Sequence, residues 1–296
     1  MALFSSLADR LRMLLPLRYR AKHPLVPVVR LSGAIGAALP LRPGLSVSSC
    51  APALERAFGM PGIKAVALVV NSPGGSAVQS HLIYKRIRAH AEEKKVPVFV
   101  FVEDVAASGG YMIACAGEEI FADPSSLVGS IGVIFAGFGF ERLIERFGVE
   151  RRVHTAGRNK AMLDPFRPER PEDVERLKEI QARVHATFRG LVESRRGARL
   201  KGEPENLFSG EVWAGPEALE HGLIDGLGDV RAVMRERFGD KVRLPVIPTE
   251  RPSLLARWFR RSGSPQATFG SPQALVDPTA VIAAIEERAA WARWGL

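Results

Sequence analysis

Two apolar runs separated by one helix-length segment restrict the fold of this chain more than any other feature. Residues 63–70 and 96–102 are almost entirely apolar, and residues 77–95 between them carry an apolar helical face that includes Leu82 and Ile87. Continuous apolar runs of this length are typical of strands that are buried on both faces of a parallel sheet. Because a strand, a crossover helix and a second strand form the unit of such a sheet, the sequence predicts an α/β fold.

The rest of the middle of the chain continues this alternation. The longest predicted helix covers residues 171–196, where apolar residues recur at spacings of three and four, and Pro171 suits its first helical position. We expect this helix to organise the fold and not to supply chemistry. Further elements predicted from the same patterns are strands at residues 25–31, 119–122 and 149–155 and a short helix at residues 109–116.

Composition divides the chain into three zones. Residues 1–23 form a basic amphipathic N-terminal segment, residues 24–246 hold the alternating strands and helices, and residues 247–296 form a linker and a C-terminal helical extension. The linker is the stretch 262–272, which is rich in Pro, Gly and Ser. With 296 residues, of which 46% are hydrophobic, the chain is long enough to bury a sizeable core in its middle zone.

Positive charge is concentrated at the two ends of the chain. Lys and Arg exceed Asp and Glu by nine, and residues 1–30 hold six basic residues against one acidic residue. Basic ends favour anionic surfaces, and the apolar, aromatic and basic stretch 251–261 suits either an interfacial helix or a helix packed on the protein. Because no nucleic-acid-binding motif accompanies the charge, we do not expect nucleic acid as a partner.

Neither a metal site nor a membrane span is expected. Cys50 and Cys115 are the only cysteines, and they lack the CxxC or Cys/His spacing of a zinc site. The longest uncharged stretch in the body of the chain, residues 127–140, has 14 residues, whereas a membrane-spanning helix needs about 20. No signal peptide is evident. We therefore expect a cofactor-free, cytoplasmic protein, and peripheral membrane contact through the basic ends is an open alternative.

A glycine-rich turn follows the first of the two central strands. It reads NSPGGS at residues 71–76 and contains Pro73, which ends strand pairing, and Gly74 and Gly75, which allow close backbone approaches. Such a turn can direct backbone N–H groups at a bound carbonyl or anion. A plain tight turn explains this fragment equally well.

A second such turn, DVAASGGY at residues 104–111, places Ser108 at the start of a short helix. A serine there is next to backbone amides without internal partners, which suits a nucleophile whose intermediate carries an oxyanion. For an isolated serine the ordinary role is a helix cap. Because the carboxyl ends of adjacent parallel strands meet at one edge of a sheet, both turns are expected to face one crevice, which favours the catalytic interpretation.

A nucleophilic serine needs a base, and the sequence offers two candidates. The nucleophile elbow GxSxG is absent, and the best placed of the six histidines is His154, in the predicted strand 149–155. Lys160 follows in the segment 157–163, beside an apolar run and Arg158. A neutral lysine can take the part of histidine, although a surface lysine is the ordinary interpretation of this position.

Taken together, these segments resemble the signal peptide peptidase A family of serine–lysine peptidases. The matching strings are NSPGGS (71–76), DVAASGGYMIA (104–114), GSIGV (129–133), GRNKAMLDPF (157–166) and GEVWAGPEALEHGLIDGLG (210–228). The resemblance implies a Clp/crotonase-like α/β fold of stacked βαβ units with a mostly parallel sheet. It also implies a homo-oligomer, either ring-like or a tetramer or octamer, with active sites at protomer interfaces.

By position, the resemblance implies a catalytic role for two residues and a supporting role for four. The catalytic pair is Ser108 as nucleophile and Lys160 as general base. Three supporting residues, Gly74, Gly75 and Gly109, offer backbone amides for an oxyanion hole. The fourth, Ser130, orients the lysine amine. Such a peptidase hydrolyses extended, mostly apolar peptides, such as signal-peptide remnants or fragments of membrane proteins, without a metal or cofactor.

Two other classes of function stay open at this point. A catalytically silent scaffold or membrane adaptor on the same fold would need neither Ser108 nor Lys160. A crotonase-type acyl-CoA enzyme would use the oxyanion architecture without that pair. Reaction of Ser108 with an active-site serine probe separates a scaffold from a peptidase, and assays of acyl-CoA turnover test the third class.

Overall fold

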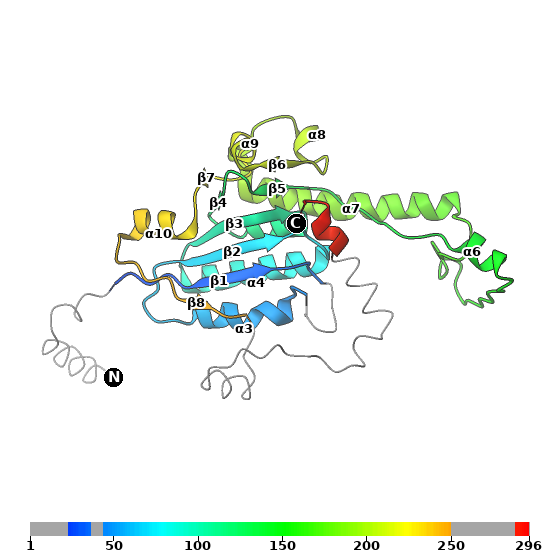
Figure 1. The fold of residues 1–296 in the computed structure, drawn as a ribbon, viewed down its shortest axis with the longest axis horizontal. Helices are drawn as coiled ribbons and strands as arrows, with labels where there is room; N and C mark the ends of the chain where they lie inside the picture. Colours follow the sequence, from blue (N-terminus) through cyan, green and yellow to red (C-terminus); the bar gives the residue numbers. More distant parts are fainter. Residues whose placement is uncertain (1–22, 37–43, 250–287, 296) are drawn as a thin grey trace, which may run out of the picture.

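An eight-stranded, mostly parallel sheet forms the centre of the protein (Figure 1). The computed structural model describes residues 23–36, 44–249 and 288–295. The basic segment 1–22 and the predicted linker 262–272 lie outside the described residues. Membrane contact through the basic ends therefore stays a prediction.

Strands and helices alternate along the described chain. The strands are β1 (Val28–Ser32), β2 (Val66–Ser72), β3 (Val98–Ala107), β4 (Glu119–Ala122), β5 (Leu127–Gly129), β6 (Val212–Ala214), β7 (Gly226–Leu227) and β8 (Val246–Ile247). The helices are α3 (Val47–Phe58), α4 (Ala77–Lys94), α5 (Gly109–Ala114), α6 (Glu141–Arg146), α7 (Pro171–Arg196), α8 (Pro204–Leu207), α9 (Gly215–Glu220) and α10 (Val230–Phe238).

The strand order is β6-β5-β3-β2-β1-β8, with β4 beside β3 and β7 beside β4. Every pairing of these strands is parallel except that of β5 with β6. The neighbouring strands β1, β2 and β3 are connected through helices α3 and α4, which is the βαβ arrangement that the apolar runs predict. The expected α/β fold of βαβ units with a mostly parallel sheet is therefore confirmed.

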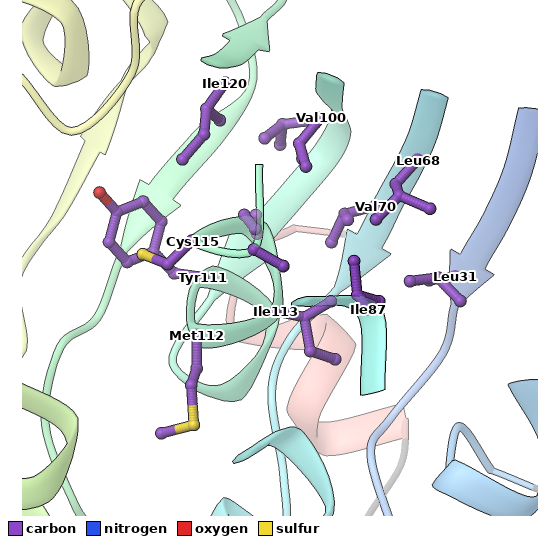
Figure 2. Packing of buried hydrophobic residues seen from close by; sticks show 14 of the residues in the cluster. Leu31, Leu68, Val70, Ile87, Val100, Tyr111, Met112, Ile113, Cys115 and Ile120 are labelled. Atoms are coloured by element: carbon purple, nitrogen blue, oxygen red, sulfur yellow. The ribbon is translucent and has the colours of Figure 1, made fainter. Parts of the chain in front are cut away.

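Both faces of the sheet are covered by helices. On one face, alternate residues of the central strands, such as Leu68, Val70 and Val100, pack with α3, α4 and α5 in the larger apolar cluster (Figure 2). On the other face, Val69 and Phe101 belong to a smaller cluster that includes residues of α10. Burial of an aliphatic side chain of this size stabilises the fold by about 1.5–3 kcal/mol. Burial on both faces explains why these strands are apolar without interruption.

Strand β3 changes its partner along its length. Its first half pairs with β4 and its last three residues pair with β5, and between the halves its register against β2 shifts. The side chain of Asn71 bridges this irregularity, since its Oδ1 accepts a hydrogen bond from the N–H of Val105 at 3.3 Å and its Nδ2 donates to the carboxylate of Asp104. With these polar groups satisfied, the strand continues to Ala107, well beyond the predicted end at residue 102.

Three further sequence-based expectations differ from the structure. Residues 149–155 form no strand, because they lie away from the sheet and no strand of the described residues lies beside them. Helix α3, which contains Pro52, has no counterpart among the predicted elements. Leu82 is 45% exposed, whereas the adjacent Ile83 is buried. Neighbouring residues of a helix point in different directions, so both side chains could not face the core.

A long projection, here called the arm, comprises residues 135–183. It contains the chain after β5, helix α6 and the first half of α7, and Figure 1 shows it extending away from the sheet. Inside the arm, the ring centroids of Phe140 and Phe166 lie 5.6 Å apart, and the guanidinium of Arg151 lies 4.5 Å from the centroid of Phe166. Large apolar side chains of the arm nevertheless remain exposed; they include Phe135, Phe138, Leu143, Phe147 and Ile180.

Helix α7 has the predicted bounds, but only its final third packs on the body of the protein. Phe188, Leu191 and Val192 are buried, whereas Ile180 of the same predicted apolar face is 40% exposed in the arm. Periodicity alone therefore identified the helix without showing which part of it would be covered. Among the helices of the described residues, none combines the length and apolar character that crossing a membrane requires.

A buried ion pair attaches the end of α7 to the sheet. Arg196, whose side chain is 1% exposed, donates to the carboxylate of Asp225 at 2.7 Å and to the carbonyl of Gly222 at 2.9 Å. Asp225 also accepts the N–H of Ile120 in β4 at 2.8 Å. Burial acts to raise the pKa of Asp225, but the hydrogen bonds and charge of Arg196 outweigh it and hold that pKa below its ordinary value.

We expect Asp225→Ala to lower the free energy of unfolding by about 3–5 kcal/mol, because it leaves the buried guanidinium of Arg196 without its partner. The stabilisation is present above the unfolded-state pKa of Asp225 and is lost as the pH falls through the lower folded-state pKa. Chemical unfolding followed by circular dichroism measures the loss. The exposed pair of Arg189 and Glu193 on the same helix supplies the matched control. There, Glu193→Ala should cost about 0.3–0.5 kcal/mol, and equal costs at the two sites would contradict the role of the buried pair.

Candidate active site

The two glycine-rich turns meet at the carboxyl ends of β2 and β3. Gly74, with φ +102°, lies so close to the second turn that a Cβ there would be 2.8 Å from the Cβ of Ser108 and 3.1 Å from the nitrogen of Gly109. Ser72 supports the first turn, since its Oγ donates to the carbonyl of Gly33 at 2.7 Å and accepts the N–H of Gly74 at 3.2 Å. Only glycine combines this φ with this approach, and it brings the two turns into one crevice.

Ser108 has an unusual backbone conformation between β3 and α5. Its φ of 51° and ψ of −118° lie in a region that L-residues rarely adopt, at a cost of order 1–3 kcal/mol. Its N–H donates to the carbonyl of Gly129 at 2.8 Å, which continues the pairing of β3 with β5. Its side chain makes no capping hydrogen bond to α5. The ordinary role of a serine before a helix therefore does not account for this residue.

Two backbone amides in the crevice have no acceptor among the described residues. The N–H of Gly74 donates to Oγ of Ser72. Around Gly75, the N–H of Ile35 donates to the carbonyl of Gly74 and the N–H of Ser76 donates to the carbonyl of Ile35, both at 2.8 Å. The N–H of Gly75 itself takes part in neither bond. Gly109 begins α5 and so has no helical acceptor for its N–H. The free amides are thus those of Gly75 and Gly109, which favours Gly75 over Gly74 for an oxyanion hole.

Ser130 directly follows β5 and also has a positive φ of 51°. Its N–H donates to the carbonyl of Glu211 at 2.5 Å. The carbonyl of the next residue, Ile131, lies 3.2 Å from Nε2 of His185 in α7. The loop that carries Ser130 is therefore held from both sides, and sequence reasoning gave His185 no part in this.

A single cavity of about 720 Å³ joins these groups. The predicted site residues in its wall are Ser108, Gly74, Gly75, Gly109 and Ser130. The apolar side chains in its wall include Ile35, Met112, Ile134, Val184 and Phe188. An apolar cavity of this size with a few convergent polar groups is typical of a binding site for a ligand or a peptide side chain.

Lys160, the predicted base, is not among the residues that line this cavity. It lies in the arm between α6 and α7 with its side chain exposed, and its N–H donates to the carbonyl of Gly157 at 3.2 Å. Asp173 supports this segment by accepting the N–H of Leu163 at 3.3 Å and two hydrogen bonds from Arg170. Those bonds from Arg170 hold the pKa of Asp173 below its ordinary value.

His154 and the two cysteines are not placed to act as a base or a nucleophile at this cavity. His154 is exposed in the arm and does not line the cavity. Burial raises the pKa of Cys50 to about 11 and that of Cys115 to about 12, so both thiols stay protonated at neutral pH, and only a thiolate is a good nucleophile. Within the described part of the chain, no group of three or more His, Cys, Asp or Glu side chains is placed to hold a metal ion.

A family model of known proteins matches this part of the chain. The model of peptidase family S49 matches residues 90–241, a stretch that includes Ser108, Ser130 and Lys160. The chain belongs to peptidase family S49. A putative protease of Synechocystis sp., slr0021, is 33% identical over 62% of this chain and 67% of its own length. The chloroplastic serine protease SPPA of Arabidopsis thaliana is 36% identical over 56% of this chain and 24% of its own length.

Two longer proteins match almost the whole chain. They come from Brucella abortus and Brucella melitensis, carry the name Na(+)/H(+) antiporter NhaA, and are 52% identical over 98% of this chain. This chain spans 40% of their length, so that name belongs to proteins much longer than the matched part. Among solved structures, a mutant of the 1510-N membrane-bound stomatin-specific protease has a TM-score of 0.48 and 16% identity over 77% of this chain and 99% of its own.

We expect the strain at Ser108 to reverse the usual order of stability of glycine and alanine. Glycine in a regular element is less stable than alanine by about 0.5–1 kcal/mol. At the positive φ of Ser108 glycine relieves the strain, so Ser108→Gly should be more stable than Ser108→Ala by about 1 kcal/mol. Chemical unfolding of the two variants measures the difference. Ser125, in an exposed turn and without a positive φ, is the control. If glycine were the less stable at both positions, the strain would be refuted.

Proposed function

We propose that this family S49 protein is a serine endopeptidase in which Ser108 attacks the peptide bond and Lys160 acts as the base. The observation that carries the proposal is the position of Ser108. It is a strained serine without a capping role, in the wall of a cavity and beside two amides that have no acceptor among the described residues. A scaffold gains nothing from holding a serine in a conformation that costs about 1–3 kcal/mol.

The proposed reaction begins when Oγ of Ser108 bonds to the carbonyl carbon of the substrate and its proton passes to neutral Nζ of Lys160. The carbonyl oxygen becomes an oxyanion, which the N–H groups of Gly75 and Gly109 stabilise. As the C–N bond breaks, the lysine returns the proton to the leaving amine, and an acyl ester of the serine remains. The lysine then takes a proton from water, whose oxygen bonds to the ester carbon. As the bond from that carbon to Oγ of Ser108 breaks, the lysine returns the proton to Oγ and the acid is released. Ser130 orients the lysine amine.

We further propose that Lys160 reaches Ser108 from a second copy of the chain. Within one copy, the arm holds Lys160 outside the wall of the cavity. The arm also leaves large apolar side chains in solvent, since Phe138 is 78% and Phe147 is 72% exposed. Exposed apolar patches mark protein–protein contacts, and one such contact repeated around an axis builds a closed ring.

The walls of the cavity favour an extended, mostly apolar peptide as substrate. Ile134, Val184 and Phe188 line the cavity that contains Ser108. Residues 131–140 run from the end of β5 without pairing to another strand in the described chain, so an extended peptide can pair with this edge. A relative from Enterococcus faecium, 32% identical over 56% of this chain, is named a putative signal peptide peptidase. Signal-peptide remnants and membrane-protein fragments are therefore the substrate class that we propose.

Ser108→Ala and Lys160→Ala should each abolish hydrolysis of a fluorogenic apolar peptide and leave the folded structure intact. If a second copy supplies the lysine, mixing the two inactive variants in equal amounts should restore about a quarter of the wild-type activity, because one interface in four then carries both intact residues. No recovery after verified exchange of subunits would show that the pair acts within one chain.

Lys178→Ala is the matched control for the lysine, because Lys178 is another exposed lysine of the arm and pairs with Glu175 at 3.2 Å. It should keep wild-type activity. Full activity in purified Ser108→Ala would refute the proposed function as a whole.

A further inference from the structure

One segment of the described chain lies at the cavity of Ser108 and has no part in the proposed reaction. Residues 288–295 form a short helix and a turn, and Ala290 and Arg293 line the same cavity as Ser108 and Gly75. Figure 1 shows this helix in red, beside the carboxyl ends of the central strands. A segment far along the sequence thus contributes to the wall beside the candidate nucleophile.

We propose that residues 288–295 dock in the substrate cleft of their own chain and block it, so that the protein is autoinhibited until the segment is displaced. The catalytic consequence rests on the proposed function, whereas the docking is a binding event that can be measured without catalysis. The occupant of the cleft is therefore a named part of this chain.

Contacts within the segment show that it is an ordered, packed element. The indole N–H of Trp294 is buried without a hydrogen-bond partner among the described residues, and the guanidinium of Arg293 lies 5.3 Å from the centroid of the Trp294 ring. The N–H of Arg293 donates to the carbonyl of Ala289 at 3.2 Å, and that of Trp294 to the carbonyl of Trp291 at 2.9 Å. These contacts hold the turn that follows the short helix.

The helical backbone of the segment suits it to block the cleft and not to be cleaved. Peptides that pair with the edge of a site do so in an extended conformation, with backbone groups free for the enzyme. In residues 288–292 the backbone is helical, and the N–H groups of residues 293–295 donate to carbonyls of this helix, which are therefore not free to pair with the edge of a site. Ala290 and Arg293 form part of the wall of the cavity that a substrate of Ser108 would enter, so the docked segment narrows the space for that substrate.

Covalent attachment makes even weak docking effective. A tethered segment meets its site at an effective concentration of about 1 mM. When most molecules hold the segment in the cleft, the apparent affinity for substrate is the intrinsic affinity multiplied by the fraction of molecules whose cleft is open. Release of the segment should therefore raise kcat/KM for a peptide about 3- to 30-fold.

Two substitutions of an alanine by arginine, each made in the 296-residue chain, test the docking. Ala290→Arg puts a long cation where the segment meets the cavity and should raise kcat/KM for a fluorogenic apolar peptide by about 3- to 30-fold. Ala292→Arg lies on the same segment, is exposed and does not line the cavity, so it should leave kcat/KM unchanged. Deletion of residues 288–296 should reproduce the effect of Ala290→Arg.

A binding measurement separates the docking from the proposed function. A fluorescent peptide with the sequence of residues 288–296 should bind the deletion variant that carries Ser108→Ala, measured by anisotropy. It should bind undeleted Ser108→Ala more weakly, because there the cleft is occupied. If no variant hydrolyses peptides but the binding follows this pattern, the proposed function fails and the docking stands. If Ser108-dependent hydrolysis is present but neither Ala290→Arg nor the deletion raises it, and the peptide does not bind, the docking is overturned.

Discussion

The change of partner along β3 is the structural feature on which the candidate active site depends. If β3 had continued to pair with β4, its end would lie beside a different strand and the loop after β5 would not reach Ser108. Instead, the last residues of β3 pair with β5, which aligns Ala107 with Gly129. The N–H of Ser108 then donates to the carbonyl of Gly129. Asn71, from the neighbouring strand, satisfies the backbone where the register shifts. One irregularity in a buried sheet thus brings three separate segments to one crevice.

The site contains strain that the surrounding core has to support. Ser108 and Ser130 both have a φ of 51°, and a Cβ at Gly74 would contact the backbone of the second turn. Strained positions persist only where neighbouring structure determines them, and the buried strands beneath the crevice provide that support. Proteins depart from locally favourable choices mainly at functional sites, where geometry matters more than stability. The crevice shows this pattern, whereas the sheet below it does not.

Helix α7 links the rigid body to an arm that has few contacts of its own. Its end is fixed by the buried pair of Arg196 and Asp225, while its beginning carries exposed apolar side chains away from the sheet. In the functional proposal, the arm of one copy completes the cleft of another and residues 288–295 close the cleft of their own chain. Both events are non-covalent docking at one cavity. The accessibility of Ser108 would then be set by competition between a substrate and residues 288–295, in a cleft that the second copy completes.

The sequence alone determined the strands β2 and β3, the helix between them, the bounds of α7 and the two glycine-rich turns. These features depend on residues a few positions apart, whose periodicity and backbone freedom can be read locally. Only the tertiary structure decided that β3 extends to Ala107, that residues 149–155 form no strand, and that only the final third of α7 packs on the body. It alone decided that, among the described residues, the N–H of Gly75 and not that of Gly74 is without an acceptor, and that Lys160 lies outside the cavity. Such outcomes depend on which distant segments come into contact, and a local pattern carries no information about those partners.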